Sequence, residues 1–227
     1  MATRILLIED DANIRTSLAM LLRQEGYAVS EASSGEEGLV LFTEVAADVV
    51  LVDLMLPGVD GFEVTRELRK TSAVPVIVVS ARTGTPDIVT ALEIGADDYV
   101  TKPVTAKELF ARIRASMRRA HTGAWNETSL KFGDVEISVE KGAVRKAGSE
   151  VSLTRTEFRL LCELAARPRW VMSRPQLLER VWGYDYFGDT RLVDVHIGRL
   201  RSKIETDPSK PELLLTMRGV GYKLQAP

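Results

Sequence analysis

The chain has 227 residues, 45% of them hydrophobic, and carries 30 Lys and Arg against 32 Asp and Glu. This length accommodates two domains of ordinary size, each able to bury a core. The net charge is −5 in residues 1–120 and +3 in residues 121–227, so we expect only the second half to bind nucleic acid. No apolar run reaches the length of a membrane span or a signal-peptide core, and we expect a cytoplasmic protein without a membrane partner.

Four short apolar runs in the first half each end in polar residues. The runs cover residues 5–8, 49–52, 76–79 and 98–100, and they lead into Glu9-Asp10-Asp11, Asp53, Ser80 and Thr101-Lys102-Pro103 respectively. Short β-branched runs separated by helical stretches predict a doubly wound parallel sheet of the α/β class. In such sheets the ligand site lies beyond the carboxyl ends of the strands, so four strand ends are expected to form one site.

The residue types at these ends indicate phosphoryl chemistry. Asp10, Asp11 and Asp53 would repel one another unless a cation lay among them, and oxygen ligands favour Mg²⁺. No His or Cys lies near these ends, so zinc or iron is not indicated. Lys102 and Ser80 would offset the charge of a phosphoryl group, while Asp53, alone at the end of its strand, is the expected nucleophile.

The same motifs, in this order and spacing, resemble the receiver domain of two-component response regulators. The matching segments are residues 10–11, 53–58, 80–82 and 95–103. The resemblance implies a flavodoxin-like, five-stranded sheet and a cis bond before Pro103. It also implies a Mg²⁺ site formed by Asp10, Asp11, Asp53 and the Met55 carbonyl. Asp53 is the implied phosphoacceptor, Ser80 and Tyr99 are the implied switch residues, and Lys102 is implied to contact the phosphoryl group. A sensor histidine kinase is the implied phosphoryl donor.

The second half is predicted to be a smaller α+β domain. We expect a receiver over residues 1–120, a linker over 121–128 and a second domain over 129–227. Alternation at Val135, Ile137 and Val139 predicts an antiparallel sheet. Two helices are expected at 154–166 and from the N-cap Ser173 to Trp182. The single cysteine, Cys162, falls in the first of these and is expected to be buried and structural.

A third helix carries the functional signal of this half. Val193, Ile197, Leu200 and Ile204 form a core-facing stripe at helical spacing. The opposite face presents Arg191, Val195, Gly198 and Ser202, flanked by Arg199. Arginines beside a small-residue gap suit a DNA major groove, although a solvated surface helix would show similar charge.

The end of the chain predicts a hairpin with Arg218 at its tip, able to enter a minor groove. With residues 153–158, 177–182 and 193–204, the segment Arg218-Gly219-Val220-Gly221-Tyr222 resembles the winged helix-turn-helix domain of the OmpR/PhoB family. The resemblance implies promoter binding, and a loop at 183–188 available to RNA polymerase. Gly198 departs from the basic residue common in the family. The full set of expected DNA contacts is Arg191, Val195, His196, Arg199, Arg201, Thr216, Arg218 and Tyr222.

Phosphorylation is expected to produce a homodimer through the receiver face spanning residues 86–119. Acidic and basic residues on this face would pair across a two-fold axis, and Ile88 would replace a basic residue that is common in relatives. The expected interface residues are Ile88, Asp97, Asp98, Glu108, Arg112 and Arg114.

Competing interpretations are weaker. Asp10 and Asp11 alone could cap a helix, and Lys102 alone could be a solvated charge. An aspartyl-phosphate phosphatase would have a second acidic residue at the position of Met55. A flavin-binding protein would have a phosphate-binding loop after the first strand, where this chain has Glu9-Asp10-Asp11. An enzyme is therefore not expected. The alternative of a DNA-binding regulator that works without phosphorylation stays open.

Overall fold

The structure is a computed structural model that describes residues 2–117, 129–183 and 190–225. The chain divides into two compact units, residues 1–117 and 118–227. The predicted linker at 121–128 and most of the predicted polymerase-contact loop lie outside the described residues. In the part of the chain that is described, no helix is long and apolar enough to cross a membrane.

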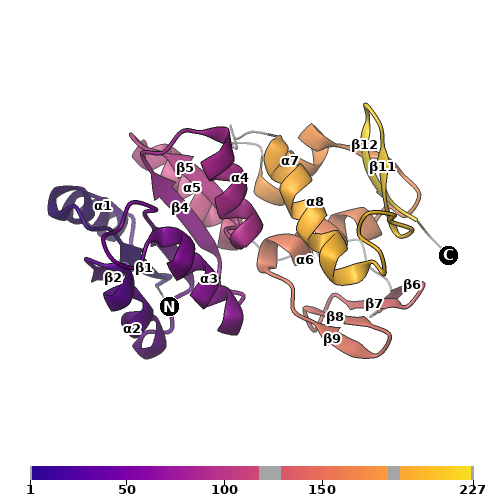
Figure 1. The fold of residues 1–227 in the computed structure, drawn as a ribbon, viewed down its shortest axis with the longest axis horizontal. Helices are drawn as coiled ribbons and strands as arrows, with labels where there is room; N and C mark the ends of the chain where they lie inside the picture. The colour runs from indigo at the N-terminus through magenta and orange to yellow at the C-terminus, as the bar shows by residue number, and fades with distance from the viewer. Residues whose placement is uncertain (1, 118–128, 184–189, 226–227) are drawn as a thin grey trace. The chain divides into compact units, whose positions relative to one another are not determined.

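The first unit is a doubly wound α/β sheet in which five parallel strands follow the order β2-β1-β3-β4-β5 (Figure 1). Every residue of β3 and β4 is buried, as expected for strands covered on both faces. The predicted fold class is confirmed. Its elements are β1 (Arg4–Ile8), α1 (Ala12–Gln24), β2 (Ala28–Ala32), α2 (Gly35–Glu44), β3 (Val49–Val52), α3 (Gly61–Thr71), β4 (Val76–Ser80), α4 (Thr85–Ile94), β5 (Asp98–Thr101) and α5 (Ala106–Met117).

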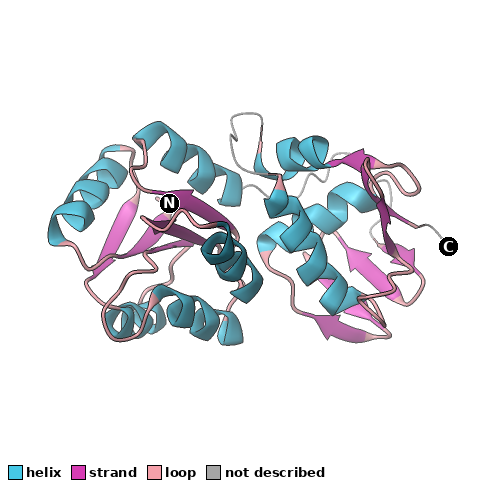
Figure 2. Ribbon diagram, turned by 45° about the horizontal axis from the view of Figure 1, so that its top comes forward, coloured by secondary structure: helices cyan, strands magenta, loops and turns pink. Residues whose placement is uncertain are grey.

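Helices cover both faces of this sheet (Figure 2). Leu22 of α1 and Ile113 of α5 share one buried apolar cluster with Leu7 and Val79 of the strands. On the other face α2 contacts β1 and α3, and α3 contacts α4. This arrangement leaves the carboxyl ends of the strands as the edge at which loops and side chains converge.

A close approach of backbone fixes the loop after β3. A Cβ added to Gly61, the first residue of α3, would lie 2.0 Å from the carbonyl oxygen of Asp53. Only glycine therefore lets α3 begin so near the end of β3. The cap of α3 is Asp60, whose side chain accepts a hydrogen bond from Glu63 N.

Within its described residues, the second unit contains a four-stranded antiparallel sheet, three helices and a three-stranded sheet that includes the terminal hairpin. Both predicted helix starts are confirmed, with capping boxes at Thr154 with Glu157 and at Ser173 with Gln176. The elements are β6 (Leu130–Phe132), β7 (Val135–Ser138), β8 (Ala143–Lys146), β9 (Ser149–Val151), α6 (Arg155–Ala165), β10 (Met172–Ser173), α7 (Arg174–Trp182), α8 (Arg191–Ile204), β11 (Leu214–Met217) and β12 (Gly221–Leu224).

The core of the second unit forms around α8. Its predicted core stripe, Val193, Ile197, Leu200 and Ile204, is buried throughout. Cys162 of α6 is also buried, and burial raises the pKa of its thiol to about 12. The thiol therefore stays protonated and unreactive near neutral pH, as expected of a structural cysteine.

Candidate functional site

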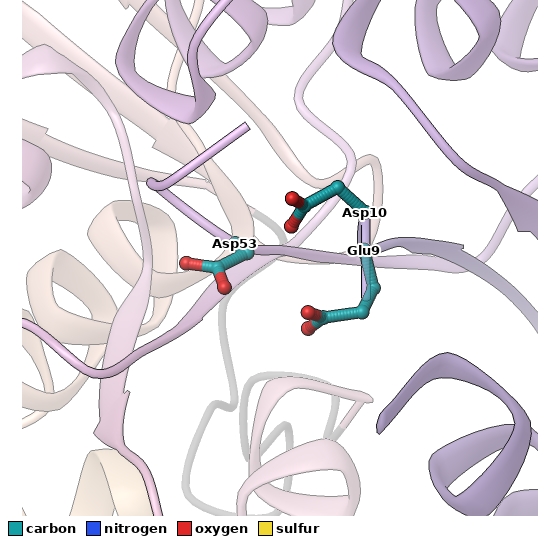
Figure 3. A group of neighbouring side chains, drawn as sticks. All are labelled: Glu9, Asp10 and Asp53. Atoms are coloured by element: carbon teal, nitrogen blue, oxygen red, sulfur yellow. The ribbon is translucent and has the colours of Figure 1, made fainter. Parts of the chain in front are cut away.

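Three carboxylates meet at the carboxyl ends of β1 and β3. One oxygen each of Glu9, Asp10 and Asp53 lies within 4.8 Å of the others (Figure 3). Glu9 and Asp53 are buried, whereas Asp10 is exposed. Oxygen donors at this spacing fit a hard divalent cation such as Mg²⁺, which would relieve their mutual repulsion.

Asp11 does not belong to this cluster, and its predicted role as a metal ligand is wrong in this structure. Its Oδ1 accepts hydrogen bonds from Asn13 N at 2.8 Å and Ile14 N at 3.0 Å, so it caps α1. These backbone donors hold the pKa of Asp11 below its usual range. Glu9 takes the place in the cluster that was expected of Asp11. The side chains of consecutive residues project in different directions, and the sequence does not show which of the three adjacent acids lie near Asp53.

Lys102, the residue after β5, connects two of the three acids. Its Nζ donates to Glu9 Oε2 at 2.6 Å and to Asp53 Oδ2 at 2.5 Å. Burial raises the pKa of Glu9. Burial lowers the pKa of Lys102, but the hydrogen bonds that it donates to Asp53 and Glu9 outweigh burial, and the net pKa is raised. Lys102 therefore remains a cation, and the bond to Pro103 is cis as expected.

Backbone contacts hold the acids in place. Asp53 Oδ1 accepts from Met55 N at 3.0 Å, which leaves Oδ2 to Lys102. Arg15 of α1 donates to the carbonyls of Glu9 at 2.7 Å and Asp10 at 3.1 Å, and so ties the turn that carries both acids to the helix. The predicted role of the Met55 carbonyl stays a prediction.

Ser80 and Tyr99 lie on the neighbouring strands β4 and β5. Ser80 is fully buried, and its Oγ has no hydrogen-bond partner within the described residues. The Tyr99 hydroxyl donates to Arg82 O at 2.7 Å, and burial raises the pKa of this phenol. A buried hydroxyl donor is thus available at the end of β4, where an incoming anion would accept from it.

The outer face of α8 presents part of the predicted DNA-contact set. Arg191, Gly198 and Ser202 are exposed, and Val195 is partly exposed. A Cβ at Gly198 would meet no atom within 4 Å. The hairpin tip between β11 and β12 exposes Arg218, and Thr216 is exposed on β11. These residues are accessible to a ligand, and their role as DNA contacts stays a prediction.

Two predicted DNA contacts are buried, and their assignment as contacts is wrong in this structure. His196 is fully buried and packs on Trp182, with ring centroids 5.4 Å apart. Tyr222 is only 5% exposed, and its hydroxyl donates to Asp194 Oδ1 at 2.7 Å. Both positions look polar in the sequence, but their neighbours in the fold cover them.

Two arginines of α8 already bind protein groups. Arg201 donates to Leu214 O at 2.9 and 2.6 Å and to Thr216 Oγ1 at 2.7 Å, which fastens α8 to the hairpin. Arg199 lies 2.7 Å from Glu157 of α6 and is only 11% exposed. The predicted DNA contacts of Arg199 and Arg201 stay predictions, and both side chains also hold the domain together.

The charges of the predicted dimer face are also used within the chain. Asp97 pairs with Arg69 at 2.6 Å, and Asp98 pairs with Arg112 at 2.9 Å. Glu108 accepts from the same Arg112 at 2.7 Å. Asp97, Asp98 and Arg112 are buried, so the prediction that they are available to a second subunit is wrong for this structure. Ile88 is partly exposed, and Arg114 is exposed, 3.5 Å from Glu25.

Comparison with known proteins identifies both units. Residues 5–114 match the response regulator receiver domain, and residues 148–224 match the C-terminal domain of transcriptional regulatory proteins. The transcriptional regulatory protein AfsQ1 of Streptomyces coelicolor is 49% identical over 98% of both chains. The DNA-binding response regulator MtrA of Mycobacterium tuberculosis is 47% identical over 100% of this chain and 99% of its own.

The chain belongs to the OmpR/PhoB family of response regulators. Its fold agrees with the crystal structure of DrrB, a Thermotoga maritima OmpR/PhoB homologue, with a TM-score of 0.52 and 32% identity over 100% of both chains. The regulator thus combines a receiver with a winged-helix DNA-binding domain. The acidic cluster at Glu9, Asp10 and Asp53 lies where receivers of this family bind Mg²⁺.

Proposed function

We propose that the regulator binds promoter DNA under the control of phosphorylation at Asp53, with a sensor histidine kinase as donor. The observation that carries this proposal is the position of Asp53. Its carboxylate ends β3 beside Glu9 and Asp10, and its Oδ2 lies 2.5 Å from Lys102 Nζ. A nucleophile, a cation-binding acid pair and a fixed positive charge are the groups that phosphoryl transfer requires.

In this proposal an Asp53 carboxylate oxygen attacks the phosphorus atom. The bond from phosphorus to the kinase histidine nitrogen breaks, and its electron pair stays on that nitrogen, so the product is an acyl phosphate. Glu9, Asp10, Asp53 and the Met55 carbonyl would hold Mg²⁺, which when bound would offset negative charge on the phosphoryl oxygens. Lys102 would bind a phosphoryl oxygen in place of the Asp53 contact, and Ser80 Oγ would donate to another.

The signal would reach DNA by pairing two regulators. Ser80 would move toward the phosphoryl group and Tyr99 would turn inward as a two-state switch of the face formed by α4, β5 and α5. Dimerisation through this face would let one dimer bind two DNA half-sites at once, and the resulting effective concentration would raise its affinity for DNA. The outer face of α8 and Arg218 would contact the DNA, and RNA polymerase would be the later partner.

The decisive experiment is phosphoryl uptake with Mg²⁺ and a small phosphoryl donor, read as a mass increase on the intact protein. Asp53→Asn should remove the uptake because it keeps the shape and removes the nucleophile. Asp60→Asn, which keeps a helix cap, is the matched control and should retain wild-type uptake. Uptake by Asp53→Asn at the wild-type rate would overturn the assignment.

A regulator that binds DNA without phosphorylation is the alternative. It predicts that Asp53→Asn and wild type bind a promoter duplex equally after incubation with the donor. The complete set of acceptor groups at the strand ends favours the phosphorylated form. Sedimentation of both proteins with and without donor separates the two models.

A further inference from the structure

One arginine holds the backbone of the acidic turn, residues 9–11, which follows β1. The carbonyl oxygens of Glu9 and Asp10 both accept from Nη1 of Arg15, at 2.7 and 3.1 Å. The carbonyl oxygen of Asp11 accepts from the backbone N–H of the same arginine at 2.8 Å. Arg15 thus binds the carbonyl oxygen of each acid in the turn, two through its side chain and one through its backbone.

The side-chain contacts of Arg15 restrain the direction of Asp10. The two carbonyls that its Nη1 binds lie on the peptide planes before and after Asp10. Because peptide units are planar, the two backbone dihedral angles of Asp10 relate these planes. Holding both oxygens against one nitrogen therefore restrains those angles, and with them the direction of the Asp10 side chain.

Asp10 differs from the other two acids of the cluster (Figure 3). Glu9 and Asp53 are buried, and both accept from Lys102 Nζ. Asp10 is exposed, so packing constrains its side chain less, and its backbone conformation has a larger share in where the carboxylate lies. The contacts that Arg15 makes with the turn therefore bear on Asp10 more than on Glu9 or Asp53.

A second arginine of α1 carries the same charge without the same contacts. Arg15 Nε lies 4.0 Å from Glu31 Oε2, and Arg23 Nη2 lies 2.7 Å from Glu31 Oε1. Arg15 donates to the acidic turn, whereas Arg23 donates to the carbonyl of Val29 in β2 at 3.1 Å. Replacing either arginine removes one positive charge beside Glu31, but replacing Arg15 also releases the turn.

We propose that Arg15 is a positioning residue for the divalent cation, because it holds the Asp10 carboxylate toward Asp53 through the backbone of the turn. The proposal rests on the proposed Mg²⁺ site at Glu9, Asp10 and Asp53. A nearby positive charge would by itself repel the cation and weaken its binding, whereas a correctly directed carboxylate strengthens binding. The two effects of Arg15 have opposite signs, so the sign of the measured change separates them.

The test is Arg15→Met in the full-length regulator. Methionine keeps an unbranched stem and a similar helix propensity but removes the charge and the donors. Mg²⁺ affinity is measured from the backbone amide resonances of residues 53–55 during a Mg²⁺ titration. We expect the dissociation constant to rise by about tenfold, because the Asp10 carboxylate is no longer held toward the cluster. A dissociation constant that is unchanged or lower in Arg15→Met would overturn the proposal.

Arg23→Met is the matched control because it removes the same charge beside Glu31 and leaves the contacts of the acidic turn in place. It should bind Mg²⁺ as tightly as wild type or slightly more tightly, since one repelling charge is gone. A loss of affinity in Arg23→Met equal to that in Arg15→Met would overturn the proposal, because the loss would then follow from the Glu31 pair and not from the turn.

A measurement without metal separates positioning from a general loss of structure. In the metal-free protein, the carbonyl carbon resonances of Glu9 and Asp10 should move in Arg15→Met, because both carbonyls lose a hydrogen bond, while those of β4 stay in place. A change of similar size in β4 would show a structural role and overturn the proposal. Wild type without saturable Mg²⁺ binding would instead reject the metal site itself, and the positioning role with it.

Discussion

The two units bury charged groups in opposite ways. In the receiver, Lys102 and Glu9 converge from strand ends 93 residues apart, and Asp53 joins them from a third strand. In the DNA-binding domain, Glu157, Arg199 and Lys203 join two packed helices. The receiver groups stand at the rim of a sheet, where a ligand can reach them, whereas the second set lies between elements. Buried charge therefore gathers at the strand ends in the first unit and joins packed helices in the second.

The largest expected effect is a loss of stability when a buried arginine of the receiver is replaced, compared with the replacement of an exposed one. Arg112→Glu leaves the buried Asp98 without its 2.9 Å partner and adds a like charge, so unfolding free energy should fall by about 3–5 kcal/mol. Arg114→Glu alters an exposed pair at 3.5 Å and should change stability little. Urea unfolding of the isolated receiver measures both. Equal stability of the two variants would contradict the assignment of Arg112 as an internal residue.

A smaller effect compares the two adjacent acids after β1. Asp10→Asn should weaken Mg²⁺ binding by about tenfold to 100-fold because it removes a ligand charge from the cluster. Asp11→Asn should bind Mg²⁺ nearly as wild type does, because asparagine caps a helix as well as aspartate. Titration calorimetry with Mg²⁺ gives both affinities. A large loss in Asp11→Asn would restore Asp11 as a ligand.

The hairpin tip should behave as a phosphate contact. Binding is measured to a duplex selected from a random pool by the wild-type protein and to a shuffled duplex of the same composition. Arg218→Ala should weaken binding to both duplexes alike and reduce the slope of log affinity against log salt by about 0.9. Val220→Ala alters the same exposed hairpin tip without removing a charge and serves as the control for shape. Selective loss of the selected duplex in Arg218→Ala would indicate a base contact instead of a phosphate contact.

The smallest effect concerns alkaline pH and the contact between α8 and the hairpin. Burial, followed by the hydrogen bond to Asp194, raises the pKa of Tyr222 to about 12. Because the folded pKa lies above the unfolded value near 10, this phenol contributes stability below about pH 10, and the contribution is lost as pH rises toward 12. Phenolate absorbance should show the late titration step in wild type and not in Tyr222→Phe.

Much of the fold could be predicted from local patterns. Alternation and apolar runs gave correct strands because side-chain direction in a strand has a fixed period. Thr154 and Ser173 marked helix starts because a cap satisfies backbone donors within one turn. The spacing of Val193, Ile197 and Leu200 gave the buried stripe of α8 for the same local reason. Asp53 and Lys102 were placed at one site because parallel strands end at one edge.

By itself, then, the sequence determined the two domains, the gathering of Asp53 and Lys102 at the strand ends and the core face of α8. Only the tertiary structure decided that Glu9 and not Asp11 joins the acid cluster, because the Asp11 side chain caps the first turn of α1. It also decided that Tyr222 turns inward and that Arg199 meets Glu157. The last two outcomes depend on which element packs beside α8, since a buried charge or hydroxyl takes whatever partner that packing provides.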